Sequence, residues 1–290
     1  MNADASRSYR DLQRLARATG RGTQELLDLY VHERFLARLA ASRYKDQFVL
    51  KGGLLLTVLD VRRPTRDVDL MARALSNDSA TIETTVAEIA SLDGNDGIVF
   101  DIARIDCGAI REDGRYGARR VKMPVALSTA KLRLQLDISV GDPVEPRSVN
   151  YVELLGGRFT LLGYPIEQVL AEKVATMVAR GDTNTRDRDW ADVYLLAQRH
   201  DVPAKELGKA LEATSAHRGH ELRPLAEVIR TLPGFRQRPW TAFRARAGLE
   251  ATTPELFQEL FDAVSGFVDP ILLGRSDGRW DPRSQQWNKS

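Results

Sequence analysis

The chain has 290 residues, of which 43% are hydrophobic and 28% are charged, and its formal net charge at pH 7 is +2. These values are typical of a soluble globular protein of one or two domains, and so small a positive charge does not by itself indicate nucleic-acid binding. The single cysteine, Cys107, excludes an internal disulfide and a cysteine-based zinc site, and it favours a reducing, intracellular setting. The four histidines show no metal-ligand spacing, which gives hydrolase chemistry little support. Without an apolar signal region or a membrane-spanning run, the chain is expected to be cytoplasmic, with no membrane partner.

Two helices are predicted before the first strand, over residues 7–18 and 24–42. In the second, apolar residues recur at helical spacing and Thr23 is the expected N-cap, so this helix should pack on a core. Its arginines are predicted to lie on the solvated face, where they could meet a nucleic acid: Arg34, Arg38 and Arg43.

A strand, a glycine pair and a short helix follow. The apolar run 48–50 reads as a buried strand that leads into Lys51-Gly52-Gly53. Two glycines let the backbone turn sharply and approach a bulky ligand, and the start of the helix predicted over 54–59 would favour a phosphate. Arg63-Pro64 is expected to end this helix.

The next strand, predicted over 65–71, carries an Asp-x-Asp pair. Asp67 and Asp69 share one face because strand side chains alternate. Such a pair is often merely solvated, but two adjacent carboxylates repel each other, and a divalent cation held by oxygen ligands removes that conflict. Mg²⁺ with substrate phosphates is the usual case.

The predicted core continues with a helix over 79–91, a strand over 98–105, a polar connection over 106–116 and a strand over 120–127. Residues 131–142 show the clearest alternation in the chain and place Asp137 on the polar side of a strand. Two interpretations follow: an exposed amphipathic strand, or a third carboxylate that meets Asp67 and Asp69 across the sheet.

The character of the chain becomes helical after Tyr164, with helices predicted over 166–180, from 188 onward, and near 204–214, 223–232 and 254–268. Lys173 on the first of these helices and Asp189 with Asp192 on the second suggest a structural ion pair between helices, or part of a ligand site. An arginine-rich stretch, 235–240, lies between two predicted helices, and the polar tail 274–290 is expected to dock on the surface or stay disordered.

Four blocks, in order, resemble the AbiEii/AbiGii toxin family, which includes MenT-type toxins, within the DNA-polymerase-β-like nucleotidyltransferases. The first block is Lys51-Gly52-Gly53 with Thr65-Arg66-Asp67-Val68-Asp69, and the second is Leu136-Asp137-Ile138 followed by Gly141-Asp142. The third and fourth blocks are Ala171-Glu172-Lys173 and Arg188-Asp189-x-x-Asp192-Val193-Tyr194. The superfamily commonly has Gly-Ser where this chain has Gly52-Gly53, so a hydroxyl contact to phosphate is lost there.

The resemblance implies transfer of a nucleotidyl group from an NTP, with Mg²⁺, by a toxin that works beside an antitoxin. Asp67, Asp69 and Asp137 would hold two metal ions. The implied catalytic set adds Lys173 and Asp189, and the implied nucleotide-binding residues are Lys51, Gly52, Gly53, Thr65, Lys173 and Asp192.

These observations predict an α/β (α+β) protein with a mixed sheet of nucleotidyltransferase type. The expected divisions are an N-terminal helical segment (1–45), a nucleotidyltransferase core (46–160) and a helical C-terminal domain (161–290). The expected function is a toxin, of phage-defence type, that modifies RNA, with the 3′ end of tRNA as acceptor. Alternatives are an NTP-dependent kinase, a protein-modifying nucleotidyltransferase, or an inactive nucleotide- or RNA-binding module. RNA contacts are predicted from basic residues: Arg34, Arg38, Arg119, Arg120, Lys122, Arg180, Arg186, Arg188 and Arg218.

Overall fold

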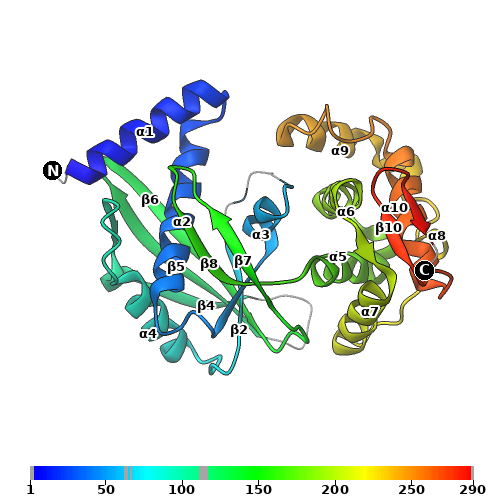
Figure 1. Ribbon diagram of the computed structural model, residues 1–290, viewed down its shortest axis with the longest axis horizontal. Helices are drawn as coiled ribbons and strands as arrows, with labels where there is room; N and C mark the ends of the chain where they lie inside the picture. Colours follow the sequence, from blue (N-terminus) through cyan, green and yellow to red (C-terminus); the bar gives the residue numbers. More distant parts are fainter. Residues whose placement is uncertain (1–2, 62–64, 66, 111–116, 289–290) are drawn as a thin grey trace. The chain divides into compact units, whose positions relative to one another are not determined.

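A computed structural model describes residues 3–61, 65, 67–110 and 117–288, and these residues form two compact units (Figure 1). The first unit comprises Met1–Val58, Pro64–Asp142 and Pro146–Tyr164, and the second comprises Leu59–Arg63, Pro143–Glu145 and Pro165–Ser290. The N-terminal helices therefore belong to the same compact unit as the sheet. The predicted boundaries at residues 45 and 160 stay predictions.

The first unit contains a mixed sheet and four α-helices among its described residues. The helices are α1 (Ala3–Thr19), α2 (Thr23–Ala41), α3 (Gly52–Val58) and α4 (Ser79–Ala90), with a 3₁₀ turn at Ile102–Arg104. The strands are β1 (Phe48–Lys51), β2 (Val68–Ala72), β3 (Ile98–Phe100), β4 (Asp106–Ile110), β5 (Ala118–Leu127), β6 (Ala130–Val140), β7 (Arg147–Val152) and β8 (Arg158–Gly163).

The strand order is β3-β5-β6-β2-β1-β8-β7, with β4 paired to β5. The β2–β6 and β1–β8 pairs are parallel, and the other pairs are antiparallel. The predicted mixed α/β architecture is confirmed. This order places β6, β2 and β1 side by side at the centre of the sheet, and these are the strands on which the first two sequence motifs lie.

Alternation along β6 separates the two faces of the sheet. Leu132, Leu134, Leu136 and Ile138 are buried, whereas Asp137 is half-buried on the other side. Helices α1 and α2 run along one side of the sheet in Figure 1, and α2 contacts β6 and β8. Each fully buried leucine contributes about 1.5–3 kcal/mol relative to an exposed one, so the leucine-bearing face fixes which face is left for polar chemistry.

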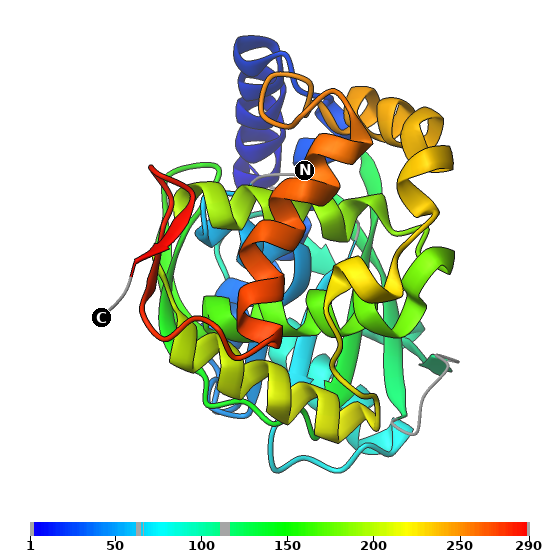
Figure 2. The same ribbon diagram turned by 90° about the vertical axis from the view of Figure 1, so that its right-hand side faces the viewer.

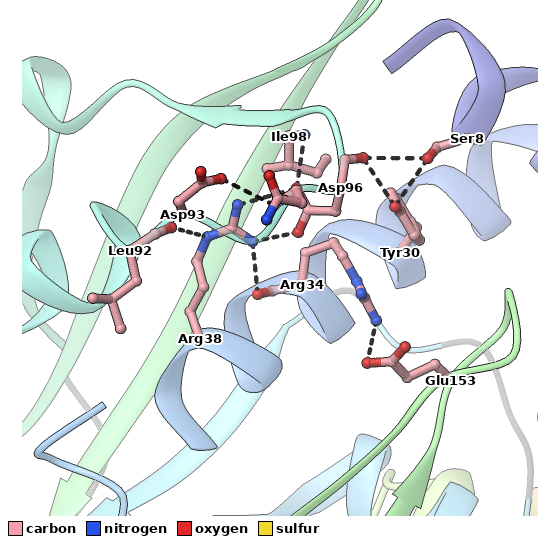
Figure 3. A network of polar contacts seen from close by, with 10 residues as sticks. Ser8, Tyr30, Arg34, Arg38, Leu92, Asp93, Asp96, Ile98 and Glu153 are labelled. Carbon is pink, nitrogen blue, oxygen red and sulfur yellow. Dashed lines mark hydrogen bonds and ion pairs between the residues drawn. The ribbon is translucent and has the colours of Figure 1, made fainter. Parts of the chain in front are cut away.

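A buried polar network joins α1 and α2 to the segment before β3 (Figure 3). The Arg38 guanidinium donates to both Asp96 carboxylate oxygens, at 2.6 and 3.0 Å, and to the carbonyl oxygens of Leu92 and Arg34. The Tyr30 hydroxyl donates to the Asp96 carbonyl oxygen at 3.0 Å. The prediction that Arg34 and Arg38 are solvated is wrong: Arg38 is 5% exposed, and Arg34 is 13% exposed and paired with Glu153. Both arginines hold the fold together, and Arg43, at 72% exposure, matches the prediction.

The second unit is mostly helical, as predicted, with a small three-stranded sheet. Its helices are α5 (Ile166–Arg180), α6 (Asp187–Arg199), α7 (Ala204–Arg218), α8 (Leu225–Val228), α9 (Leu232–Ala247) and α10 (Phe257–Leu272), with a 3₁₀ turn at Gly181–Thr183. Its strands are β9 (Val202–Pro203), β10 (Arg279–Asp281) and β11 (Gln286–Asn288). No helix in the part of the chain that the structure describes combines the length and hydropathy needed to cross a bilayer.

The C-terminal tail is docked, which settles one alternative left open by the sequence (Figure 2). Strand β10 pairs with both β9 and β11. Trp280 is 4% exposed and packs edge-on against Phe267 of α10, and Trp287 stacks on the same ring. Burial of aromatic side chains therefore holds the tail against α10.

Several predicted elements differ from the structure. The N-cap of α2 is Gly22, and Thr23 is already helical. The strand predicted over 98–105 ends at Phe100, because Asp101 donates its N–H to Pro124 and the chain enters the 3₁₀ turn. Part of the predicted 106–116 connection is strand β4, which is mostly exposed and held by pairing with β5. Strands β7 and β8 were not predicted.

The C-terminal half contains further differences. Only Leu225–Val228 is α-helical in α8, although a helix was predicted over 223–232. The arginine-rich stretch 235–240 lies inside α9 because Trp240 is buried and Arg236 pairs with Asp187. The predicted helix stop at Arg63-Pro64, Arg66 of the first motif and residues 111–116 lie outside the described residues.

Candidate active site

A row of four charged residues crosses the centre of the sheet on one face. Lys51 of β1 lies opposite Asp69 of β2, Asp69 lies opposite Asp137 of β6, and Asp137 lies opposite Arg120 of β5. Residues that are directly opposite in a ladder project from the same face. The four side chains therefore form the sequence plus, minus, minus, plus across neighbouring strands about 4.8 Å apart.

Asp69 rests on the glycine turn. Gly52 has a φ of +64°, a left-handed conformation that favours glycine, and a Cβ atom built there would overlap the Asp69 carboxylate. The close approach that the Gly-Gly pair was expected to offer a ligand is thus used by a carboxylate of the protein itself. Any side chain at Gly52 would displace Asp69, so these two motif residues form one structural unit.

Asp67 precedes β2, two residues before Asp69, and is half-buried. The Thr65 hydroxyl lies 3.3 Å from the Asp67 carbonyl oxygen and 3.4 Å from its carboxylate. These contacts stabilise the segment that leads into β2. Thr65 therefore orients Asp67, a role that the motif alone did not reveal.

Asp137 is held by Arg120 in a two-pronged ion pair. Arg120 Nε donates to Asp137 Oδ1 at 2.7 Å, and Arg120 Nη2 donates to Oδ2 at 2.6 Å. The hydrogen bonds to Asp137 raise the pKa of Arg120, and the charges of Asp137, Asp67 and Asp69 add to this effect. The guanidinium therefore interacts electrostatically with all three carboxylates that the sequence analysis identified as candidate metal ligands.

A second cluster lies beside Lys51 and centres on Asp142. One Asp142 oxygen accepts from Lys51 Nζ at 2.9 Å, from the Ser139 hydroxyl at 2.8 Å and from the Tyr164 hydroxyl at 2.5 Å. Burial alone would raise the pKa of Asp142, but the Lys51 charge and these hydrogen bonds lower it below its ordinary value. Asp142 therefore stays ionised and holds the ammonium of the first motif residue in place.

The donors of this face suit a hard divalent cation. Asp67, Asp69 and Asp137 supply carboxylate oxygens, the ligands that Mg²⁺ prefers. Among the described residues, however, no group of three or more His, Cys, Asp or Glu side chains is arranged to hold a metal ion. Both Asp137 oxygens already accept hydrogen bonds from Arg120, so the chemistry of the residues fits Mg²⁺ provided that Arg120 releases this carboxylate.

The second unit contains the other predicted site residues. Lys173 Nζ of α5 lies 3.1 Å from Asp189 Oδ1 and 2.7 Å from Asp192 Oδ2, both on α6. Arg186 Nε lies 2.7 Å from the other Asp189 oxygen. Burial would raise the pKa of Asp189, but the charges of Lys173, Arg186 and Arg188 lower it. The ion pair that the spacing suggested is present, and it includes Asp192 as well.

The basic residues predicted to contact RNA fall into two groups. Most are engaged within the protein: Arg34 and Arg38 in the buried network, Arg119 with Ser79 and Asn77, Arg120 with Asp137, Arg186 with Asp189, and Arg218 with Thr176. Arg180 and Arg188 are exposed, and Lys122 is half-buried. The structure therefore narrows the set of side chains available to a phosphate backbone.

Sequence reasoning missed the site roles of Arg120, Asp142 and Tyr164. Arg120 was predicted only as a candidate RNA contact, and Asp142 only as part of a motif. The usable signal for Arg120 was the alternation of Arg120 and Lys122 with buried Val121 and Met123 in a strand adjacent in sequence to β6. Tyr164 gave no local signal, because its contact to Asp142 depends on the parallel pairing of β8 with β1.

Comparison with known proteins gives one family match. The model of a family described as the nucleotidyl transferase AbiEii toxin of a type IV toxin–antitoxin system matches residues 34–272. A search of the curated proteins finds no match.

Among solved structures, the chain is similar to JHP933 from Helicobacter pylori, with 17% identity and a TM-score of 0.49 over 88% of this chain and 94% of that chain. A second H. pylori structure shows 17% identity and a TM-score of 0.47, over 88% of this chain and 97% of that one. An antigenic nucleotidyltransferase-like protein from Paracoccidioides brasiliensis shows 17% identity and a TM-score of 0.38, over 70% and 93%.

Proposed function

We propose that this chain, which belongs to the AbiEii nucleotidyltransferase toxin family, transfers a nucleotidyl group from an NTP to RNA, at the 3′ end of a tRNA. The family makes the chain a nucleotidyltransferase with an NTP substrate and an antitoxin partner. The RNA acceptor, the Mg²⁺ requirement, the roles of individual residues and a phage-defence setting are the proposal.

The observation that carries the proposal is the charged row across β1, β2, β6 and β5. Two carboxylates from parallel neighbouring strands lie on one face, with Asp67 two residues from Asp69. Mg²⁺ bound there would neutralise the triphosphate and the departing pyrophosphate. Asp67, Asp69 and Asp137 would hold it. A purely structural role would not require like charges to be adjacent, since repulsion between them destabilises a fold.

The remaining motif residues bind and orient the substrates in this proposal. Lys51, fixed by Asp142, and the backbone at Gly52 and Gly53 approach the phosphates, with Thr65 positioned beside Asp67. Asp137 acts as the general base, which takes the proton of the attacking 3′ hydroxyl of the RNA as that oxygen bonds to the α-phosphate and pyrophosphate leaves. A positioned acid–base group of this kind typically contributes about 10²–10⁴-fold to rate.

Following the family resemblance, we assign Lys173 to triphosphate oxygens as a point charge. Asp189 and Asp192 orient its ammonium through the two contacts on α6. The exposed Arg180 and Arg188 and the half-buried Lys122 remain as candidate phosphate contacts for RNA. Binding through such contacts should weaken as salt rises, because each neutralised phosphate releases counterions.

The test is transfer of label from α-labelled NTP to purified tRNA in the presence of Mg²⁺. Intact tRNA is compared with tRNA whose terminal ribose has been oxidised. The proposal predicts labelling of intact tRNA alone. Equal labelling of both would rule out 3′-end addition, and labelling of protein instead of RNA would favour the protein-modifying alternative.

A further inference from the structure

Arg120 occupies a distinctive place in the charged row. It lies on β5 directly opposite Asp137, and its guanidinium uses two parallel hydrogen bonds, at 2.7 and 2.6 Å, to cover both carboxylate oxygens. Paired charges with this geometry are among the strongest hydrogen-bonded contacts of side chains. A divalent cation takes carboxylate oxygens as ligands, so Arg120 and a cation compete for the same two atoms.

The surroundings of Arg120 differ from those of a structural arginine. Its side chain is 39% exposed, and that of Asp137 is 17% exposed. The guanidinium is therefore already in contact with water, and its movement away from Asp137 would not leave it buried without a partner. The neighbouring Arg119 projects from the opposite face and donates to the Asn77 carbonyl and the Ser79 hydroxyl. Only one of these two adjacent arginines faces the carboxylates.

The charges on this face also favour an exchange of partners. Asp67 and Asp69 lie within electrostatic range of Arg120, although its guanidinium donates hydrogen bonds to Asp137. Lys51, at the other end of the row, is bound to Asp142. Arg120 is thus the cation that balances Asp137 across the β5–β6 pair. A guanidinium fork fits phosphate oxygens as well as it fits a carboxylate, which a lysine does not.

We propose that Arg120 is a positioning residue of this site that exchanges partners. It pairs with Asp137 and prevents unproductive cation binding, and when a divalent cation takes Asp137, the guanidinium moves to the triphosphate of the NTP. This inference rests on the proposed function, because it assumes that Asp137 is a metal ligand. Metal binding and NTP binding then favour each other. The metal frees the Arg120 guanidinium to bind the triphosphate, and the triphosphate draws the guanidinium away from Asp137.

The test measures Mn²⁺ affinity, without turnover, by the electron paramagnetic resonance signal of free Mn²⁺. Mn²⁺ has the same preference for carboxylate oxygens as Mg²⁺. Arg120→Gln should bind Mn²⁺ roughly three- to tenfold more tightly than wild type, because a competing ion pair of this exposure is removed. Affinity for NTP in the presence of saturating Mn²⁺ should fall by about tenfold, because a charge-assisted phosphate contact is lost. The matched control, Arg119→Gln, should change neither affinity.

Arg120→Lys provides a second variant, which keeps the positive charge but cannot form the two-pronged pair. It should shift Mn²⁺ affinity in the same direction by a smaller factor, and it serves if Arg120→Gln does not fold. Unchanged Mn²⁺ affinity in these variants, or unchanged NTP affinity, would overturn the exchange. Failure of the wild-type protein to bind Mn²⁺, or Asp69→Asn binding as tightly as wild type, would instead contradict the proposed function itself.

Discussion

Two arginine–aspartate pairs in the first unit have nearly the same geometry and very different surroundings. Arg38 donates hydrogen bonds to both carboxylate oxygens of Asp96, at 2.6 and 3.0 Å. Arg120 donates to both carboxylate oxygens of Asp137, at 2.7 and 2.6 Å. Both side chains of the first pair are 5–6% exposed, whereas those of the second are 39% and 17% exposed. Hydrogen-bond geometry alone therefore does not separate a structural pair from a site pair.

The difference lies in what surrounds each pair. Arg38 also donates to the Leu92 and Arg34 carbonyl oxygens (Figure 3). Its guanidinium lies over the Phe100 ring as well, so the pair is braced on several sides. Asp137 instead has another carboxylate, Asp69, directly beside it in the ladder. A buried pair braced by further hydrogen bonds holds elements together, whereas a more exposed pair placed next to a second carboxylate remains able to exchange partners.

The largest effect on stability is expected from breaking the buried pair. Arg38→Gln should reduce the free energy of unfolding by about 3–5 kcal/mol, because it leaves Asp96 buried without its main partner. Arg120→Gln should cost less than about 1 kcal/mol, because water reaches the pair. Urea denaturation of both variants checks this, and similar losses in the two would contradict the distinction between them.

An intermediate effect is expected in the second unit. Lys173 is 12% exposed between Asp189 at 4% and Asp192 at 1%. Lys173→Met should cost about 2–4 kcal/mol, because it removes an ammonium between two buried carboxylates. The double variant Lys173→Met with Asp192→Asn should recover part of that stability. NTP affinity, measured by equilibrium binding, should stay low in both, and its recovery along with stability would leave Lys173 only a structural role.

The smallest of these effects depends on pH and involves Glu33 of α2. Burial raises the pKa of Glu33 to about 7, against lowering by hydrogen bonds from the Leu154 N–H and the Tyr151 hydroxyl. A carboxyl whose folded-state pKa is raised stabilises the fold below its ordinary value of 4.5, and that contribution is lost as pH rises toward 7. Buried His32 works in the opposite sense, because burial lowers its pKa to about 4 and its contribution is lost as pH falls from 6.5.

Replacing Glu33 separates the two opposing contributions. Between pH 4.5 and 7, the stability of Glu33→Gln relative to wild type should rise by about 2–3 kcal/mol, while wild type itself changes little over the lower part of that range. Urea midpoints at several pH values measure both curves. Parallel curves would show that the Glu33 carboxyl titrates at its ordinary pKa.

Much of the site was predictable because its residues lie on locally patterned elements. The alternation along β6 placed Asp137 on the polar face, and Asp69 lies directly opposite it in the ladder. Asp67 precedes β2, so its sharing of a face with Asp69 stays a prediction. The glycine pair also marked a real close approach, although the approaching group is the Asp69 carboxylate. In each case a repeat of two residues or a required backbone conformation carried the information.

What escaped prediction depends on contacts distant in sequence. Arg38 looked like a surface arginine because its partner, Asp96, is 58 residues away, and Tyr164 reaches Asp142 only through the β1–β8 pairing. Strand β4 lacks apolar periodicity and depends on pairing with β5. The tail, for which docking and disorder were both predicted, is held by aromatic packing. Local sequence periodicity shows which face of a strand or helix a side chain occupies. It does not show which charged residue, distant in sequence, will pair with that side chain.

Nucleotidyl transfer by the carboxylate row can be tested directly. The most direct measurement offers tRNA and Mg²⁺ with NTP labelled at either the α- or the γ-phosphate, to wild type, Asp69→Asn and the control Asp101→Asn, which alters a carboxylate outside the row. Wild type and the control should place α-label, and no γ-label, in the RNA. Asp69→Asn should lose transfer by at least about a hundredfold, with no loss of thermal stability, since it relieves repulsion. Transfer of γ-label would indicate a kinase, and undiminished α-transfer by Asp69→Asn would contradict the claim.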